Sequence, residues 1–339
     1  MSSVVLGIES SCDETAAAIV DGVYRVRSNV IASQHDLHQR YGGVVPEIAS
    51  RAHLERALPV VRQALAEANV SWSDIDAIAV GNRPGLIGSL LVGTSIGKAL
   101  AWTLDVPLIG VDHVHAHVLA GLLNDSEPMW PALGFVVSGG HTSLIMMESA
   151  LEWTVVGRTI DDAVGEAYDK VGTMLGLPHP GGPAVDALAT TGDPLTIAFP
   201  VANLGRESLD FSFSGLKTAV LYAAKGVPTK EVPPLDDARR RDLAASFQHA
   251  AVKALMRNLR RALDRFEPKT ILLGGGVAAN GVLRAAVQAE ADARAIPLRL
   301  PAIDYCLDNG AMIALAGLLR HQHGERDDWT LVPAATSRP

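Results

Sequence analysis

VVLGIESSCDETAAAIV, residues 4–20, places two apolar runs on either side of a short polar segment. Alternation of this kind predicts a strand, a turn rich in hydroxyl and acidic groups from Glu9 to Thr15, and a returning strand. The pattern recurs at 133–147, where the polar turn is Ser138-Gly139-Gly140-His141-Thr142-Ser143. The chain is therefore expected to be built from two similar halves, although two unrelated hairpins would give the same pattern.

Between these hairpins the chain alternates between strand and helix. The expected elements are a helix from Pro46 to Ala68, a strand from Ile75 to Val80, a helix from Ser89 to Leu104, a strand from Leu108 to Val111 and a helix from His113 into Leu123. A third glycine-rich turn, Gly274-Gly275-Gly276, follows an apolar run and comes shortly before a helical stretch at 283–291. The fold class predicted is α/β, of the actin-like ATPase type that sugar kinases and Hsp70 share, with a nucleotide cleft between two lobes.

The lobes are expected at residues 1–130 plus 302–339 and at residues 131–301. No Gly/Ser linker separates them. The stretch from Gly176 to Ser214 holds several prolines and glycines and is expected to be a region of substrate-contacting loops.

Composition limits the function. With 339 residues and 48% hydrophobic content the chain can bury a large core. The apolar run at 4–8 is too short for a signal peptide or a membrane span, so we expect a cytoplasmic protein with no membrane contact. Cys12 and Cys306 lie far apart, without zinc-site spacing. A formal net charge of -8 means that any nucleic-acid partner needs a local basic patch or helper proteins.

The sharpest chemical pattern is His113-Val114-His115-Ala116-His117. On a helix His113 and His117 share a face and can bind one metal ion, whereas His115 points elsewhere. Asp308, just before the apolar helix 311–319, is the best third ligand, and this donor set suits iron or zinc. Hydrogen-bonded histidines without a metal are the alternative. Val114 stands where a zinc protease of the HExxH type carries its general base, which argues against that chemistry.

Six segments together resemble one known family. They are Gly7-Ile8-Glu9-Ser10-Ser11-Cys12-Asp13-Glu14-Thr15, Tyr41-Gly42-Gly43-Val44-Val45-Pro46-Glu47, the pair His113 and His117, Val137-Ser138-Gly139-Gly140-His141-Thr142, Asp210-Phe211-Ser212-Phe213-Ser214-Gly215-Leu216-Lys217 and Asp308-Asn309-Gly310-Ala311-Met312. This set resembles the tRNA N6-adenosine threonylcarbamoyltransferases (TsaD), formerly described as O-sialoglycoprotein endopeptidases. The resemblance runs from about residue 4 to about residue 320.

The resemblance implies that the chain transfers threonylcarbamoyl from threonylcarbamoyl-AMP to N6 of adenosine 37 in tRNAs that read codons beginning with A, the t6A modification. It implies that one divalent metal ion, iron or zinc, is held by His113, His117 and Asp308, and that an adenine nucleotide is bound as threonylcarbamoyl-AMP, ATP or AMP. The implied substrate-binding residues are Val136, Val137, Ser138, Gly139, Gly140, Asp169, Gly182, Asp186 and Asn280. The implied partners are tRNA, a paralogous actin-like subunit of the TsaB type and a small ATPase of the TsaE type.

Some features stay open at this point. Asp13 and Glu14 are our candidates for proton handling or orientation. Arg83 stands where the family usually has glycine, which indicates either a different turn or a cation near the cleft. Arg257, Arg261 and Arg265 form a basic line on a predicted helix and are the best candidate for a tRNA-binding patch. A metalloprotease, a plain actin-like ATPase and a scaffold subunit are the alternative functions.

Overall fold

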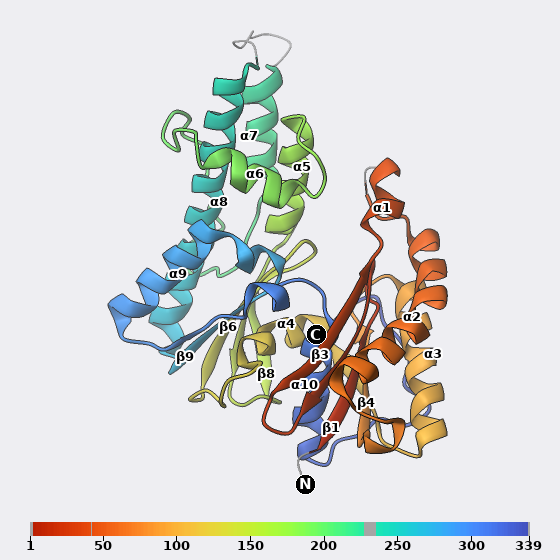
Figure 1. Ribbon diagram of the computed structural model, residues 1–339. Helices are drawn as coiled ribbons and strands as arrows, with labels where there is room; N and C mark the ends of the chain where they lie inside the picture. Colours follow the sequence, from red (N-terminus) through yellow and green to blue (C-terminus); the bar gives the residue numbers. More distant parts are fainter. Residues whose placement is uncertain (1–2, 42, 227–234, 338–339) are drawn as a thin grey trace. The chain divides into compact units, whose positions relative to one another are not determined.

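The computed structural model describes residues 3–41, 43–226 and 235–337 (Figure 1). Gly42, one residue of the second family segment, lies outside the described residues. The chain divides into two compact units. Unit 1 comprises Met1–Pro128 and Arg299–Pro339, and unit 2 comprises Met129–Leu298. Each unit contains its own five-stranded sheet.

The sheet of unit 1 has the strand order β3-β2-β1-β4-β5. Its strands are β1 (Val4–Glu9), β2 (Glu14–Asp21), β3 (Val26–Ser33), β4 (Ala77–Arg83) and β5 (Leu108–Asp112). β1 and β2 form the antiparallel hairpin that residues 4–20 predict, and β1 pairs in parallel with β4. The expected hairpin is confirmed, and β3 extends it by a strand that the sequence pattern did not reveal.

Helices cover both faces of this sheet. α2 (Pro46–Ala68) and α3 (Ile87–Leu104) pack on the face that presents Leu6 and Ile8, whose side chains are buried among theirs. α10 (Gly310–Gln322) packs on the other face, where a Cβ at Gly7 would lie 2.3 Å from the Ala314 nitrogen. Small residues such as Gly7 and Ala314 let α10 approach the strands closely. This packing places Asp308, which comes just before α10, near the ends of β1 and β5.

The remaining elements of unit 1 are short. They are α1 (His35–His38), α4 (His113–Leu119) and the 3-10 turns Gln39–Tyr41, Trp72–Asp74, Ala120–Leu122 and Ile303–Tyr305. α3 is long and apolar enough to cross a membrane by length and composition alone. It packs against β4 and α2, and Leu90 and Ala101 lie in the core of unit 1, whereas Ile87, Leu91 and Trp102 are exposed.

The sheet of unit 2 has the order β10-β9-β6-β7-β8. Its strands are β6 (Ala132–Val137), β7 (Thr142–Met147), β8 (Trp153–Arg158), β9 (Thr270–Gly274) and β10 (Leu298–Arg299). β6 pairs antiparallel with β7 and parallel with β9, just as β1 pairs with β2 and β4. The expectation of two similar halves is therefore confirmed at the level of strand pairing.

Unit 2 is richer in helix than the sequence pattern indicated. Its helices are α5 (Val164–Met174), α6 (Gly181–Ala189), α7 (Ser214–Lys225), α8 (Asp237–Phe266) and α9 (Gly281–Arg294), with a 3-10 turn at Gly276–Ala279. The expectation of loops throughout 176–214 was wrong for α6. Pro180 precedes that helix and Pro183 lies in its first turn, where a proline costs no helical hydrogen bond.

Candidate metal centre and substrate site

Helix α4 begins directly where β5 ends, and one carboxylate fixes that start. Oδ1 of Asp112 accepts hydrogen bonds from the backbone nitrogens of Val114 (3.0 Å) and His115 (3.2 Å), which is a typical N-cap. His113 and His117 then lie one turn apart, with ring centroids separated by 4.6 Å. The cap therefore sets the orientation of both imidazoles relative to the sheet.

Asp308 approaches the two histidines from the start of α10. The next residue, Asn309, caps this helix by accepting a hydrogen bond from the Met312 nitrogen at 3.0 Å. Oδ1 of Asp308 lies 3.1 Å from Nε2 of His117 and 3.5 Å from Nε2 of His113. One ligand atom from each residue falls within 4.8 Å of the others, while His115 is buried outside this cluster. The structure thus brings His113, His117 and Asp308 together.

Glu9 supports this cluster, and sequence reasoning did not single it out. Its side chain is fully buried at the end of β1, with Oε2 3.0 Å from Nδ1 of His113 and Oε1 accepting from the Ser11 nitrogen. A Cβ at Gly81 would lie 2.8 Å from Oε2, so that glycine leaves room for the carboxylate. A neutral His113 that donates Nδ1–H to Glu9 has an unprotonated Nε2 on the side of Asp308, which is the form that a metal ligand requires. The sequence signal that could have identified it is an acidic residue that directly follows the apolar strand segment 4–8.

The charges of the metal-free cluster are shared between its members. Burial lowers the pKa of His117, and this effect exceeds the attraction of Asp308. Burial also lowers the pKa of His113, but Glu9 and Asp308 overcome it and raise that pKa well above the usual value. The two histidines hold the pKa of Asp308 well below its usual range despite burial. A proton on His113 therefore occupies the position that a cation would take, and metal binding would release it.

The donor set fits a divalent transition metal. Two neutral imidazole nitrogens and one carboxylate oxygen converge from α4 and from the start of α10, and the acidic Glu9 lies behind one imidazole. Three protein ligands leave coordination positions open for substrate oxygens, and nitrogen with oxygen donors suits iron or zinc better than magnesium or calcium.

The β1–β2 turn contributes further acids. Glu14 opens β2, and burial together with Asp308 and Asp13 raises its pKa to about 9. The metal-free protein therefore carries Glu14 in its protonated form near neutral pH, able to donate a proton but not to accept one. Burial also raises the pKa of the Cys12 thiol, so that group is not a ready thiolate.

Buried polar side chains hold this turn in place. The Nε2–H group of His53 donates to the Cys12 carbonyl at 3.0 Å, and its Nδ1 lies 2.8 Å from the Thr15 hydroxyl. The Gln34 nitrogen donates to the Asp13 carbonyl at 3.1 Å. Arg83 is the last residue of β4 and does not have a positive φ, so the backbone does not require glycine there, and a cationic role of Arg83 stays a prediction.

In unit 2 the corresponding turn lies between β6 and β7. Gly139 and Gly140 are exposed, and their backbone N–H groups donate to no acceptor within residues 3–41, 43–226 and 235–337. The neighbouring groups are fixed, because the Ser138 and Gly139 carbonyls accept from Gly165 and Glu166 at 3.2 Å each, at the start of α5. Two open amides on a braced turn are able to donate hydrogen bonds to anionic oxygens, so Gly139 and Gly140 stay candidates for substrate binding.

Val136 and Val137 precede this turn inside β6. Both side chains are fully buried, and both residues pair with β7, with Val136 also paired to β9. Their side chains are therefore closed to a ligand, and their predicted role in substrate binding is reduced to support of the turn. The triple glycine approaches the same turn: Gly275 has φ +91°, and a Cβ there would lie 2.5 Å from the Val137 carbonyl oxygen. Glycine is needed at position 275 because it adopts the positive φ without strain and because a side chain there would clash with the Val137 carbonyl.

Asp169 and Gly182 meet where α5 packs against α6. Oδ1 of Asp169 accepts from the backbone nitrogens of Gly181 (2.8 Å) and Gly182 (3.2 Å), so this carboxylate holds the first turn of α6. Asp186 lies one turn further along α6 and is partly exposed. A Cβ at Gly182 would touch nothing within 4 Å, which leaves that position open to a ligand.

Asn280 has a structural task of its own. Its Oδ1 caps α9 by accepting from the Leu283 nitrogen at 2.9 Å, and its Nδ2 donates to Oε1 of Gln248 at 2.9 Å. Gln248 in turn accepts from the Tyr168 hydroxyl at 3.3 Å. The sequence gave no indication that the amide already had protein partners, so replacing Asn280 changes the fold locally as well as any ligand contact.

The basic line on α8 is largely used by the protein itself. Arg261 donates to the carbonyls of Gly205 (3.1 Å) and Ser208 (3.2 Å), and Arg265 donates to the backbone carbonyl (2.8 Å) and to Oε2 (3.0 Å) of Glu207. These bonds to carbonyl groups leave the positive charge of both guanidinium groups in place, so the tRNA-binding line stays a prediction. They fix residues 205–208 against α8.

Comparisons with known proteins agree with this geometry. Residues 25–315 match the family TsaD, tRNA N6-adenosine threonylcarbamoyltransferase. A curated tRNA N6-adenosine threonylcarbamoyltransferase of Symbiobacterium thermophilum is 51% identical over 97% of this chain and 94% of its own length. One from Bacillus cereus is 48% identical over 96% of this chain and 93% of its own length.

Solved structures show the fold. HypF from T. kodakarensis superposes with a TM-score of 0.61 at 15% identity, over 95% of this chain and 48% of that one. The (R)-2-hydroxyglutaryl-CoA dehydratase component A of Acidaminococcus fermentans gives a TM-score of 0.52 at 12% identity, over 94% and 99% of the two chains. The architecture is that of the actin-like ATPases, as the two hairpins predicted.

Proposed function

The chain belongs to the tRNA N6-adenosine threonylcarbamoyltransferase family, and on that premise we propose how its own residues carry out the transfer. The reaction moves a threonylcarbamoyl group from threonylcarbamoyl-AMP to N6 of an adenosine in tRNA, and adenosine 37 is the position we propose. The observation that carries the proposal is the convergence of His113, His117 and Asp308, backed by Glu9, in a chain about half identical to curated transferases.

The bond changes are simple. The exocyclic N6 amine attacks the carbamoyl carbon, a C–N bond forms, and the C–O bond to phosphate breaks. AMP leaves with the bonding electron pair, and the amine loses one proton. A divalent metal at the His113, His117 and Asp308 set would supply Lewis acidity to substrate oxygens.

Protein groups position the reactants around this step. We propose that the N–H groups of Gly139 and Gly140 bind phosphate oxygens of the adenylate and so stabilise AMP as it leaves. Glu14, protonated near neutral pH without metal, is suited to orient or protonate a substrate oxygen, and Asp13 to orient it. Asp186 and the open face of Gly182 are proposed to contact the nucleoside. Asp169 supports them by holding the first turn of α6.

A protease is not favoured. The residue after His113 is Val114, and Glu9, the carboxylate that contacts His113 from outside the ligand set, bonds its Nδ1 side. It therefore faces away from the atoms that would hold a metal, and cannot activate a metal-bound water as a HExxH glutamate does.

The partners and the compartment are proposals too. We propose that the chain acts in the cytoplasm with a paralogous TsaB-type subunit and a TsaE-type ATPase, because its net charge of -8 gives no overall attraction for tRNA.

The decisive experiment supplies purified protein, with and without those two subunits, with threonylcarbamoyl-AMP and tRNA. Formation of the modified nucleoside, measured by mass spectrometry after nuclease digestion, is expected only with the partners present. Full activity of the isolated chain at ordinary salt would reject the partner requirement, and no product under any combination would reject the transferase assignment.

A further inference from the structure

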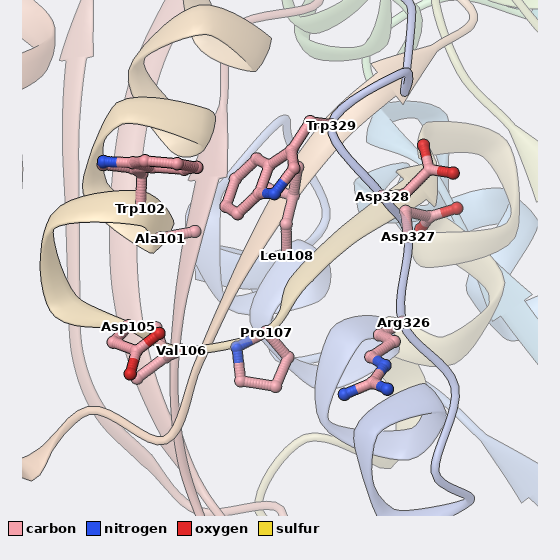
Figure 2. Close-up of a pocket in the computed structure, with 10 residues that line it drawn as sticks. All are labelled: Ala101, Trp102, Asp105, Val106, Pro107, Leu108, Arg326, Asp327, Asp328 and Trp329. Carbon is pink, nitrogen blue, oxygen red and sulfur yellow. The ribbon is translucent and has the colours of Figure 1, made fainter.

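A cavity of about 670 Å³ opens in unit 1 where α3 ends and the chain enters β5 (Figure 2). Residues 326–329, which follow α10, complete its wall. β5 runs from Leu108 in this wall to Asp112 beside His113, and at about 3.3 Å per residue its two ends lie roughly 13 Å apart. The cavity is therefore separate from the candidate metal centre.

Two tryptophans stand exposed at its rim. Trp102 is 71% and Trp329 48% exposed, and their rings meet edge to face with centroids 5.3 Å apart. The segment that carries Trp329 is anchored, since Lys98 donates to the Trp329 carbonyl at 2.8 Å and the Asp327 nitrogen donates to Leu108 at 2.8 Å. Large indoles held in the open at one place are typical anchors of protein interfaces.

Opposite charges face each other across the cavity. Figure 2 shows Asp105 and Arg326 on opposite sides of Pro107. Both are exposed, and in the described part of the chain neither forms an ion pair. Asp327, by contrast, already binds Arg320 (3.0 Å) and the Gly110 nitrogen (2.8 Å).

The end of the cavity near Trp102 suits a cation. Asp105 stands at the C-terminal end of α3, where the partial negative charge of the helix adds to its own. Tryptophan faces attract ammonium and guanidinium groups more strongly than other aromatic rings do. Val106, Pro107 and Leu108 provide an apolar floor that matches the aliphatic stem of a long basic side chain.

We propose that this indole pocket, formed by Trp102, Asp105, Pro107, Arg326 and Trp329, binds a protein partner through a segment that carries a basic and an acidic side chain. The basic group lies between Trp102 and Asp105, and the acidic group meets Arg326. RNA fits poorly, because Asp105 repels phosphate and most of the net charge of -8 falls in unit 1. This site is independent of the transfer reaction.

The test uses the full-length chain and a synthetic peptide of alternating arginine and glutamate, titrated by intrinsic tryptophan fluorescence and by calorimetry. Trp102→Ala is expected to weaken peptide binding about tenfold. Asp105→Asn and Arg326→Gln should each weaken it severalfold. Trp102→Phe, which keeps an aromatic face, should retain most of the affinity. Leu195→Ala, at a 74% exposed apolar residue of unit 2, is the matched control and should bind as the wild type does.

Folding is checked by the thermal midpoint of each variant. A peptide affinity that is the same in wild type, Trp102→Ala and Asp105→Asn overturns the proposal. So does preferential binding of single-stranded oligoadenylate over the peptide, because that result would assign the pocket to nucleic acid.

Discussion

The β1–β2 turn of unit 1 and the β6–β7 turn of unit 2 occupy the same place in similar sheets but expose opposite chemistry. The first turn, Glu9 to Thr15, presents carboxyl groups, and Glu9 reaches the ligand His113. The second, Ser138 to His141, presents the open backbone amides of Gly139 and Gly140. One duplicated frame thus places a candidate cation site in one unit and the candidate anion site that we propose in the other.

The difference also shows how such sites are recognised. Side-chain ligands leave a spacing in the sequence, as His113 and His117 do. Backbone donors are marked in the sequence only by glycines, and the role of each glycine depends on its surroundings. An added Cβ would meet nothing within 4 Å at Gly139, whereas at Gly275 it would clash with the Val137 carbonyl. The predictions below separate these roles, beginning with the largest effect.

Removing a metal ligand should destroy the cation site of unit 1 and leave unit 2 unaffected. We expect Asp308→Ala to lower the affinity for the metal more than about a hundredfold, because a directly coordinating oxygen is removed. Metal content of purified protein, measured by plasma mass spectrometry, checks this. His115→Ala, which changes a buried histidine outside the cluster, should keep its metal; equal metal content in both variants would mean that the ligand set is wrong.

The two glycines of unit 2 should respond differently to the same substitution. Gly275→Ala places a Cβ 2.5 Å from a carbonyl oxygen at φ +91° and should lower the free energy of unfolding by about 2–4 kcal/mol. Gly139→Ala should leave it almost unchanged, because nothing lies within 4 Å of the added atom. Denaturant titration of both variants measures the contrast, and similar losses would show that Gly139 is also structural.

Glu9→Gln tests the support behind His113. The amide cannot accept both from the Ser11 nitrogen and from Nδ1–H of His113, so one hydrogen bond is lost or the imidazole changes tautomer. Metal affinity is expected to fall about 10- to 100-fold. Competition with a chromophoric chelator gives the value, and Glu67→Gln on the exposed face of α2 serves as control. An unchanged affinity would reduce Glu9 to a packing residue.

The smallest effect concerns Asn280. Asn280→Ala removes the cap of α9 and should lower the free energy of unfolding by about 1–2 kcal/mol. Asn280→Ser keeps a cap but loses the bond to Gln248, so stability should largely recover. If adenylate affinity, measured by calorimetry, falls equally in both variants, Asn280 contacts the substrate. If the affinity falls in Asn280→Ala but recovers with stability in Asn280→Ser, the residue acts only through the fold.

Much of this arrangement follows from sequence. The two hairpins, the α/β alternation and the helices at 46–68 and 283–291 were indicated by apolar spacing, because those elements bury one face against a sheet. The histidine pair was indicated because helical periodicity is local. Asp308 is nearly two hundred residues away, and only its place at a helix start and the family resemblance connected it to α4.

Other features depend on contacts that no local pattern contains. Glu9 belongs to the site because α4 lies beside the end of β1, which the sequence of the turn alone does not reveal. α6 escaped notice because Gly181, Gly182 and Pro183 suggest a loop, yet all three lie in a first turn that tolerates them. The bonds of Arg261 were also not foreseen, because its acceptors, the carbonyls of Gly205 and Ser208, are backbone groups of an irregular segment.

The central claim is that the unit 1 cluster holds the metal ion on which transfer to tRNA depends. The most direct measurement compares wild type, Asp308→Ala and His115→Ala, each assembled with its partner subunits, for modified nucleoside formed from threonylcarbamoyl-AMP and tRNA, after metal removal and after stepwise return of iron or zinc. The account predicts that metal restores product in wild type and His115→Ala but not in Asp308→Ala. Equal product from metal-free and metal-loaded wild type, or full activity of Asp308→Ala, would contradict it.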